Sequence, residues 1–294
     1  MNPPESFSTF LLQKGYRAAT IYQHERYALQ YLEFIENLEV HEATYNDVLA
    51  FAEKLRGDGS SVNLINRKIL SVRHYYKYLQ HFDRLVRNPA AGIRIRGSRR
   101  KIVGGLIPME ELETLYQDYV VNDNRSLRNK AILGLIIYQA LTVDELRKLE
   151  VEHLKLREGK VHVSGSRHSN GRVLSLMAHQ ILDLQQYLLT VRPAILTEST
   201  DQFFVSMEGS LNIKPSIFHL FRALKKLNPS VINGGLIRQS VIANWLKSQN
   251  LRQVQYMAGH RYVSSTERYK ASMLEDLQKQ LSLFHPLEQG FADQ

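Results

Sequence analysis

Cysteine is absent from this sequence of 294 residues. The chain therefore has no disulfide, no thiolate metal site and no cysteine nucleophile. This absence suits a reducing compartment, and we expect a cytoplasmic protein. The first residues, MNPPESFSTFLLQKGY, lack the basic-then-apolar pattern of a secretory leader. Apolar runs such as that at 131–137 are too short to span a bilayer, so no membrane partner is expected.

Positive charge, by contrast, is in excess. The 38 Lys and Arg residues outnumber 29 Asp and Glu, which gives a net charge of +9 and a pI of about 9.6. A basic balance favours an anionic partner, nucleic acid or a membrane surface, although many soluble basic proteins bind neither. The length allows two domains, and a hydrophobic content of 44% allows a sizeable core.

The first 95 residues are predicted to form an all-α domain. Apolar residues recur at helical spacing, and glycines punctuate the pattern at Gly15 and at 57–59. Thr44 and Asp47 have the spacing of a capping box at a helix start. The expected helices cover residues 6–14, 18–38, 44–56 and 60–82.

The last of these helices mixes cations with tyrosines. Such a mixture suits a helix lying against DNA phosphates. It suits equally well a solvated face above a tyrosine-rich core, and the sequence leaves both interpretations open. The candidate DNA contacts on this helix are Arg67, Lys68, Arg73 and Lys77.

A basic stretch follows the break at Asn88-Pro89. Its cations are flanked by proline and glycine, which indicates a linker at 96–105 between two domains. A solvated charge run is the usual explanation for such a stretch, but its place between domains favours contact with a DNA backbone. The cations proposed for that contact are Arg94, Arg96, Arg99, Arg100 and Lys101.

Residues 106–294 show a mixed pattern. A capping box is predicted at Thr142 and Glu145. Alternating residues at 160–164 and 172–176 predict a hairpin, and a further short strand is expected at 202–205. The expected helices cover 108–120, 126–140, 142–149, 178–190, 214–227, 236–247, 251–257 and 271–283. We thus expect a mainly α protein with a small antiparallel sheet, in which an all-α domain precedes a mixed α+β domain.

Three residues near the C-terminal end, Arg238, His260 and Tyr269, are chemically matched. The guanidinium of an arginine clamps phosphate oxygens, a histidine donates to the same group, and a tyrosine hydroxyl can act as a nucleophile. Together they suggest phosphodiester chemistry. The structural alternative is that Gly259 caps a helix, His260 lies in a loop and Tyr269 packs in a core.

Residues 258–269, AGHRYVSSTERY, resemble the C-terminal signature of the tyrosine recombinases, roughly L-G-H-x-x-x-x-x-T-x-x-Y. Gly259, His260, Thr266 and Tyr269 are in register with it. The resemblance implies a core-binding domain followed by a catalytic domain, which clamp double-stranded DNA. It also implies site-specific recombination or integration through a 3′-phosphotyrosine, a tetramer on paired sites, and no metal or cofactor.

The resemblance breaks at three positions that are catalytic in the family. Thr142 replaces the first arginine of G-L-R-x-x-E-L, Gly235 replaces the histidine of H-x-x-R, and the hairpin has no lysine. Arg238 is retained. The resemblance leaves three residues as candidate substitutes that hold phosphate or donate a proton. These are Arg167, His168 and Arg172, of which His168 is the better acid because arginine holds its proton.

Two functions remain open, and a third of another class stands behind them. The intact spacing from Arg238 to Tyr269 favours a divergent but active recombinase. The alternative is a catalytically impaired DNA-binding accessory or regulatory protein of the same fold. A helical protein that binds some other acidic partner is the third, and it predicts no salt-dependent binding of DNA.

Overall fold

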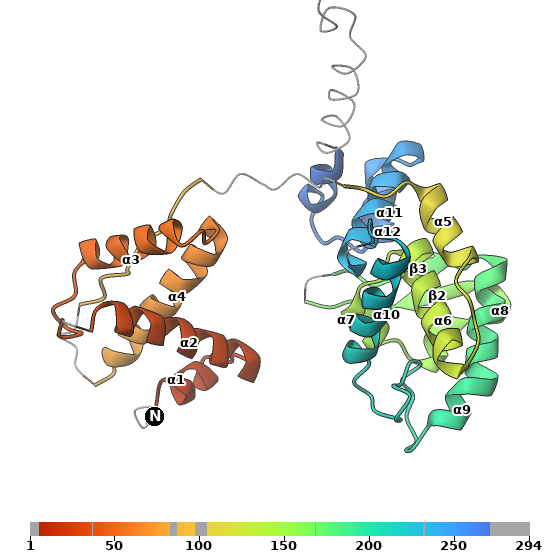
Figure 1. Cartoon of the computed structure of the whole chain (residues 1–294), viewed down its shortest axis with the longest axis horizontal. Coiled ribbons are helices and arrows are strands. Elements are labelled where there is room, and N and C mark those ends of the chain that lie inside the picture. Colours follow the sequence, from red (N-terminus) through yellow and green to blue (C-terminus); the bar gives the residue numbers. More distant parts are fainter. Residues whose placement is uncertain are drawn as a thin grey trace, which may run out of the picture. The chain divides into compact units, whose positions relative to one another are not determined.

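The computed structural model describes residues 6–36, 38–82, 87–97, 105–167, 169–231 and 233–270, and the structural statements below concern these residues. The chain divides into two compact units, Met1–Lys101 and Ile102–Gln294, which are treated separately (Figure 1). Several predictions fall outside the described residues. They are the helix at 271–283 and the site residues His168, Arg99, Arg100 and Lys101.

The described part of the first unit is all-helical, as expected. Serines begin two of its helices, since Ser6 Oγ accepts the N–H of Thr9 and Ser61 Oγ accepts that of Leu64. The predicted capping box is confirmed by Asp47 Oδ2, which accepts the N–H of Thr44 at 2.7 Å. The helices are α1 (Phe7–Gln13), α2 (Ala18–Phe34), α3 (Tyr45–Gly57) and α4 (Val62–Leu79).

Aromatic side chains form much of the core of this unit. Tyr31 of α2 packs edge-on against Phe51 of α3, with ring centroids 5.4 Å apart. Tyr76 of α4 is fully buried, and its hydroxyl donates to the carbonyl of Val40 at 2.9 Å. The tyrosines that the sequence placed beside the cations of α4 therefore include core residues.

The second unit is mainly helical around a small sheet, which confirms the expected fold class. Its α-helices are α5 (Met109–Gln117), α6 (Asn124–Gln139), α7 (Val143–Arg147), α8 (Ala178–Gln186), α9 (Arg192–Ile195), α10 (Lys214–Leu227), α11 (Gly234–Ser248) and α12 (Leu251–Ala258). Shorter helical turns are η1 (Val151–His153), η2 (Leu156–Glu158) and the π-type η3 (Tyr187–Val191). Residues 264–270 are also helical.

The sheet has three antiparallel strands in the order β1 (Leu154–Lys155), β2 (Lys160–Val163) and β3 (Arg172–Ser175). Strands β2 and β3 are the expected hairpin, and Val163 pairs with Arg172. The expected strand at 202–205 is wrong, because only Gln202 forms a bridge there. The backbone that follows bonds to Leu149 and to the hydroxyl of Tyr187, so it does not extend a strand ladder.

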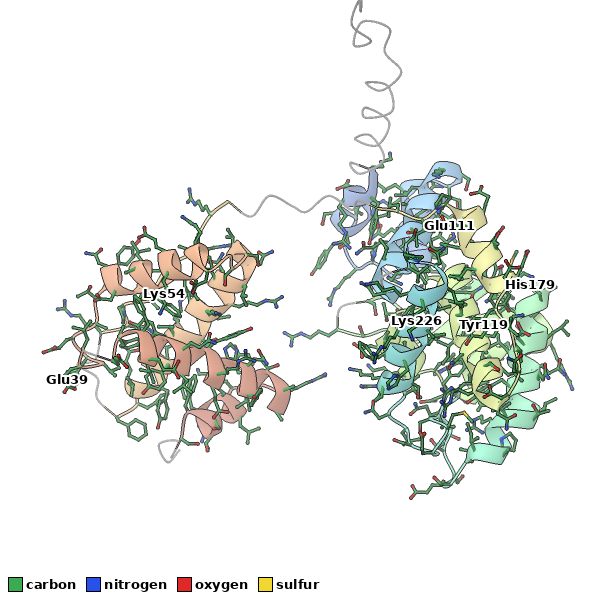
Figure 2. All side chains as sticks on the ribbon, in the orientation of Figure 1. Glu39, Lys54, Glu111, Tyr119, His179 and Lys226 are labelled. Carbon is green, nitrogen blue, oxygen red and sulfur yellow. The ribbon has the colours of Figure 1, made fainter. Side chains whose placement is uncertain are left out.

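Helix α6 runs through the middle of the second unit (Figure 1) and contacts α5, α8 and α11. It is buried along most of its length, and it ends at Ala140 in the left-handed conformation, with φ of 51°. This turn directs the chain into α7. At the far end of α10, Asn228 donates to Glu111 of α5, a residue labelled in Figure 2, at 2.7 Å.

In the part of the chain that the structure describes, no helix combines the length and the apolar character needed to cross a membrane.

Candidate active site

Thr142 begins α7 as its N-cap. Its hydroxyl accepts the N–H of Glu145 at 3.2 Å, and Glu145 Oε2 accepts the N–H of Thr142 at 2.8 Å. The predicted capping box is confirmed. Because its hydroxyl also donates to Oε2 at 2.9 Å, the Thr142 side chain is engaged with the helix start and does not supply a positive charge.

Arg172 fills the space beside this cap from β3. Its side chain is 0% exposed, and it forms two hydrogen bonds with Glu145, Nη1 to Oε1 at 2.6 Å and Nη2 to Oε2 at 3.3 Å. Burial acts to raise the pKa of Glu145, but Arg172, Thr142 and Arg238 outweigh it and hold that pKa below its ordinary value. Glu145 is thus ionised at neutral pH, and Arg172 is its main counter-ion.

Gly259 leaves room for this arginine. It ends α12 in the left-handed conformation with φ of 66°, as the helix-cap interpretation expected. A Cβ atom there would lie 2.5 Å from Arg172 Nη1 and 3.0 Å from its Cζ. Glycine is therefore required twice, once by the backbone angle and once by the approach of the guanidinium.

Arg238 reaches the same carboxylate from α11. Its side chain is 14% exposed, and Nη1 lies 3.8 Å from Glu145 Oε2. The guanidinium donates to the carbonyl of Ala140 at the turn after α6 and, at 2.6 Å, to that of Ala258 at the end of α12. The two arginines, Arg172 and Arg238, therefore flank one glutamate and leave an excess of positive charge.

Gly235, where the resemblance expects a histidine, lies in the first turn of α11. A Cβ atom at this position would lie 2.9 Å from Asn233 Oδ1, the helix cap, which accepts the N–H of Leu236 at 3.0 Å. At position 235 the first turn of α11 therefore offers backbone and the side-chain amide of the cap residue Asn233, and no imidazole.

His260 follows Gly259 and stacks on Tyr269, with ring planes 7° apart and centroids 6.2 Å apart. Its Nδ1 is 2.8 Å from Thr266 Oγ1. Burial, followed by the positive charges of Arg238, Arg268 and Arg172, lowers the pKa of His260 to about 4. The imidazole is consequently neutral at pH 7.

Tyr269 is only 1% exposed and belongs to the apolar core of the unit, as the structural alternative expected for its ring. Its hydroxyl oxygen, however, accepts a hydrogen bond from Arg268 Nη2 at 2.8 Å. The structure thus brings together the three residues predicted from the sequence, because Arg238 donates to the carbonyl of Ala258, two residues before His260, and His260 stacks on Tyr269.

The tip of the β2–β3 hairpin is attached to the loop that carries His260. Asn170 N–H donates to the carbonyl of Gly259 at 3.0 Å, and Ser169 forms a bridge with His260. Arg261 Nη1 donates to the carbonyl of Arg167 at 3.0 Å, and both of these arginine residues are exposed. Arg167 therefore presents its charge on the surface beside the site, whereas Arg172 is buried within it.

The predicted DNA contacts of the first unit fall into two groups. Arg67, Lys77, Arg94 and Arg96 are exposed. Lys68 is buried, with Nζ 5.8 Å from the centroid of the Tyr27 ring.

Arg73 is committed to the structure of the first unit. Its guanidinium donates to the carbonyls of Ala90 at 3.0 Å and Ile93 at 2.7 Å. It therefore fixes to α4 the segment that carries Arg94 and Arg96.

Within the described residues, one cluster of side chains could ligate a metal ion. It consists of Glu150, Glu152 and His153. His153 Nδ1 already accepts the N–H of Glu150 at 3.0 Å, and Glu152 is exposed. The cluster is an ordinary surface feature of η1, and it is separate from the arginines described above.

Sequence reasoning missed Arg268 and gave Glu145 only a capping role. Arg268 precedes the candidate nucleophile, so its position was a signal that could have been read. The role of Glu145 as the partner of Arg172 could not be predicted locally, because the two residues lie 27 positions apart in the sequence.

Comparison with known proteins gives the family. The model of the phage integrase family matches residues 106–275, more than half of the chain. This protein therefore belongs to the phage integrase family.

Two bacterial relatives match over nearly their full length. Tyrosine recombinase XerD of Staphylococcus epidermidis is 24% identical over 290 residues, covering 96% of this chain and 98% of the relative. Tyrosine recombinase XerD of Listeria innocua is 26% identical over 295 residues, with the same coverage. The similarity thus includes the first unit as well as the second.

Solved structures show the same fold. The XerH site-specific recombinase bound to palindromic difH substrate has a TM-score of 0.74 at 15% identity, covering 95% of this chain and 85% of XerH. The Tn1549 transposon integrase in complex with transposon right end DNA has a TM-score of 0.64 at 14% identity, with 93% and 99% covered. A lambda integrase dimer bound to a core site has a TM-score of 0.61 at 13% identity, with 90% and 93% covered.

Proposed function

We propose that this protein is a site-specific DNA recombinase or integrase that cleaves and rejoins DNA through a 3′-phosphotyrosine on Tyr269. The observation that carries the proposal is one group of side chains, in which Arg172 and Arg238 flank Glu145, and His260, beside them, stacks on Tyr269. Family membership and the near full-length similarity to tyrosine recombinases support it. Strand exchange would need four copies on two DNA sites.

Arg172 takes the part of the first arginine, whose usual position holds Thr142. It comes from the hairpin strand β3 and is bonded to Glu145, the residue that caps α7. One carboxylate flanked by two guanidiniums is an incomplete charge balance, and a scissile phosphate completes it. This supports a divergent active site in which β3 supplies the arginine in place of residue 142. In this proposal Gly235 and the hairpin without lysine are further differences from the usual catalytic residues of tyrosine recombinases.

The cleavage step balances without a metal or nucleotide. Tyr269 Oη bonds to phosphorus, and the bond from phosphorus to the 5′ oxygen breaks. The phenol proton passes to neutral His260, and the departing 5′ oxygen takes a proton from His168 or solvent. Arg238 holds the phosphate oxygens, and Arg172, which is buried against Glu145, adds positive charge to the site. The phosphotyrosine conserves the bond for rejoining when the 5′ hydroxyl of a new strand attacks.

Both units contribute to binding double-stranded DNA in this proposal. Exposed cations of the first unit contact phosphates, and residues 96–105 serve as a basic linker between domains 1–95 and 106–294. XerH and the Tn1549 integrase, which share the fold, were solved with DNA. The proposed contacts are Arg67, Lys77, Arg94, Arg96, Arg99, Arg100, Lys101 and Arg167.

A second function, DNA binding without cleavage, is supported by one observation. Tyr269 is nearly inaccessible and its hydroxyl is already bonded. A protein that regulates or assists recombination by another enzyme can tolerate this, along with Thr142 and Gly235.

The decisive experiment measures covalent adduct formation. Duplexes bound by the full chain are selected from a random pool, and nicked versions are prepared with the nick placed at each step across the selected site. The nick lets the cleaved fragment diffuse away, so the adduct accumulates. Adduct with the wild type that is absent with Tyr269→Phe supports the recombinase, whereas tight binding without adduct at any nick refutes it and supports the regulator.

A further inference from the structure

Arg268 is the hydrogen-bond donor to Tyr269 Oη within the described residues, at 2.8 Å. Its guanidinium also lies over the tyrosine ring, with Cζ 4.9 Å from the centroid. Consecutive residues on a helix point about 100° apart, so their side chains do not ordinarily meet. The contact therefore requires the Arg268 side chain to turn back over its neighbour.

The contact favours one form of the phenol. A guanidinium that donates to the oxygen stabilises that oxygen more as its negative charge increases. Arginine keeps its own protons, so Arg268 cannot be the base that removes the phenol proton. Its effect is electrostatic, and it leaves a second lone pair of Oη free to attack phosphorus.

The surrounding charges separate Arg268 from the other arginines. Glu145 of α7 faces Arg172 of β3 and Arg238 of α11, and these two are partly neutralised by it. For Arg268 no ion pair is found in the described part of the chain, and the residue is exposed. Its charge is therefore not compensated by a carboxylate within the described residues, and it lies against the hydroxyl.

We infer that Arg268 is a further catalytic residue, which contacts the nucleophilic oxygen and stabilises the negative charge that forms on it during attack. The inference rests on the proposed function, since it assigns a role within that reaction. In the balanced step, the phenol proton goes to His260 while Arg268 keeps its hydrogen bond to Oη. The competing role is a lid, in which Arg268 merely covers a resting tyrosine.

The test compares Arg268→Met, which keeps length without charge, with Arg268→Lys, which keeps charge. Lys270→Met is the matched control, because it removes an exposed cation from the other side of Tyr269. Single-turnover adduct formation is measured at saturating protein on the nicked duplex, at pH 7. A second substrate carries sulfur in place of the departing 5′ oxygen, because a thiolate leaves without being protonated.

We expect Arg268→Met to slow adduct formation at pH 7 by about 10²-fold, the effect of removing one donor to a developing oxyanion. Arg268→Lys should recover part of the rate, and Lys270→Met should stay within about threefold of wild type, as surface charges do. The defect should persist on the sulfur substrate, because it lies on the nucleophile side.

Three results would overturn the inference while leaving the proposed function intact. The first is a rate for Arg268→Met equal to that of the wild type, and the second is a faster rate, as a lid predicts. The third is a rate restored by sulfur, which would assign Arg268 to the leaving group. Absence of adduct with the wild type itself would refute the proposed function and the inference together.

Discussion

Replacing Gly259 with alanine tests how the site is assembled. The new Cβ would lie 2.5 Å from Arg172 Nη1 and 3.1 Å from the carbonyl oxygen of Asn170. Left-handed backbone costs alanine about 1–2 kcal/mol. Overpacking adds about 1–3 kcal/mol if Arg172 yields in place, and opening its buried pair with Glu145 costs about 3–5 kcal/mol.

Gly159→Ala is the matched control. Gly159 lies in the same unit with φ of 63°, and its added Cβ would meet only Ile181 Cδ1 at an ordinary 3.7 Å. The control therefore carries the backbone strain without the collision. We expect Gly259→Ala to lose about 1 kcal/mol or more beyond Gly159→Ala, the least that displacing Arg172 should cost.

The assay is urea unfolding followed by fluorescence. Trp245 on α11 is the single tryptophan of the chain, so its emission reports on the second unit. The collision is isolated by repeating Gly259→Ala in an Arg172→Met background, where the penalty should shrink. Equal losses for the two glycine variants, or an unchanged penalty without the guanidinium, would refute the reasoning.

Three further outcomes are expected. The pKa of His260 is lowered to about 4, below its unfolded value near 6.5. Between these two pH values the unfolded chain binds more protons, so the free energy of unfolding falls as the pH drops through them. For His260→Asn, unfolding followed by Trp245 fluorescence should show a weaker dependence of stability on pH. Arg172→Met should destabilise the second unit by about 3–5 kcal/mol by removing the main counter-ion of buried Glu145, and adding Glu145→Gln should restore stability while adduct formation stays about 10²-fold low. Arg67→Met should reduce the salt dependence of DNA binding by about one ion with stability unchanged, whereas Arg73→Met should destabilise the first unit, as its circular dichroism melt would show.

Local signals predicted much of the fold. The boxes at Thr44 and Thr142 marked the starts of α3 and α7, because a side chain that satisfies an exposed N–H acts within one helical turn. The alternation of apolar and polar residues at 172–176 predicted β3, because this pattern is also set by neighbouring residues. The strand expected at 202–205 failed because its backbone partners lie far away in sequence, at Leu149 and Tyr187.

The cations were harder to assign. Composition alone does not distinguish Arg67, which is exposed, from Arg73, whose donors are occupied by carbonyls 17 and 20 residues away. Arg73 is occupied because the chain folds back along α4 and places these carbonyls beside it. That contact depends on tertiary structure, which the local sequence does not reveal. Composition alone does not separate Arg167 from Arg172 either.

One local signal did separate Arg172 from Arg167. In β3 the residues Arg172 and Leu174 are both buried, whereas Val173 is exposed, so the arginine occupies an inward position of the strand. A buried cation is stable only when it is paired, which requires a carboxylate on a facing element. Glu145 was the acidic residue that its capping role already fixed at the start of α7. The same glutamate thus joins the helix start to the arginine.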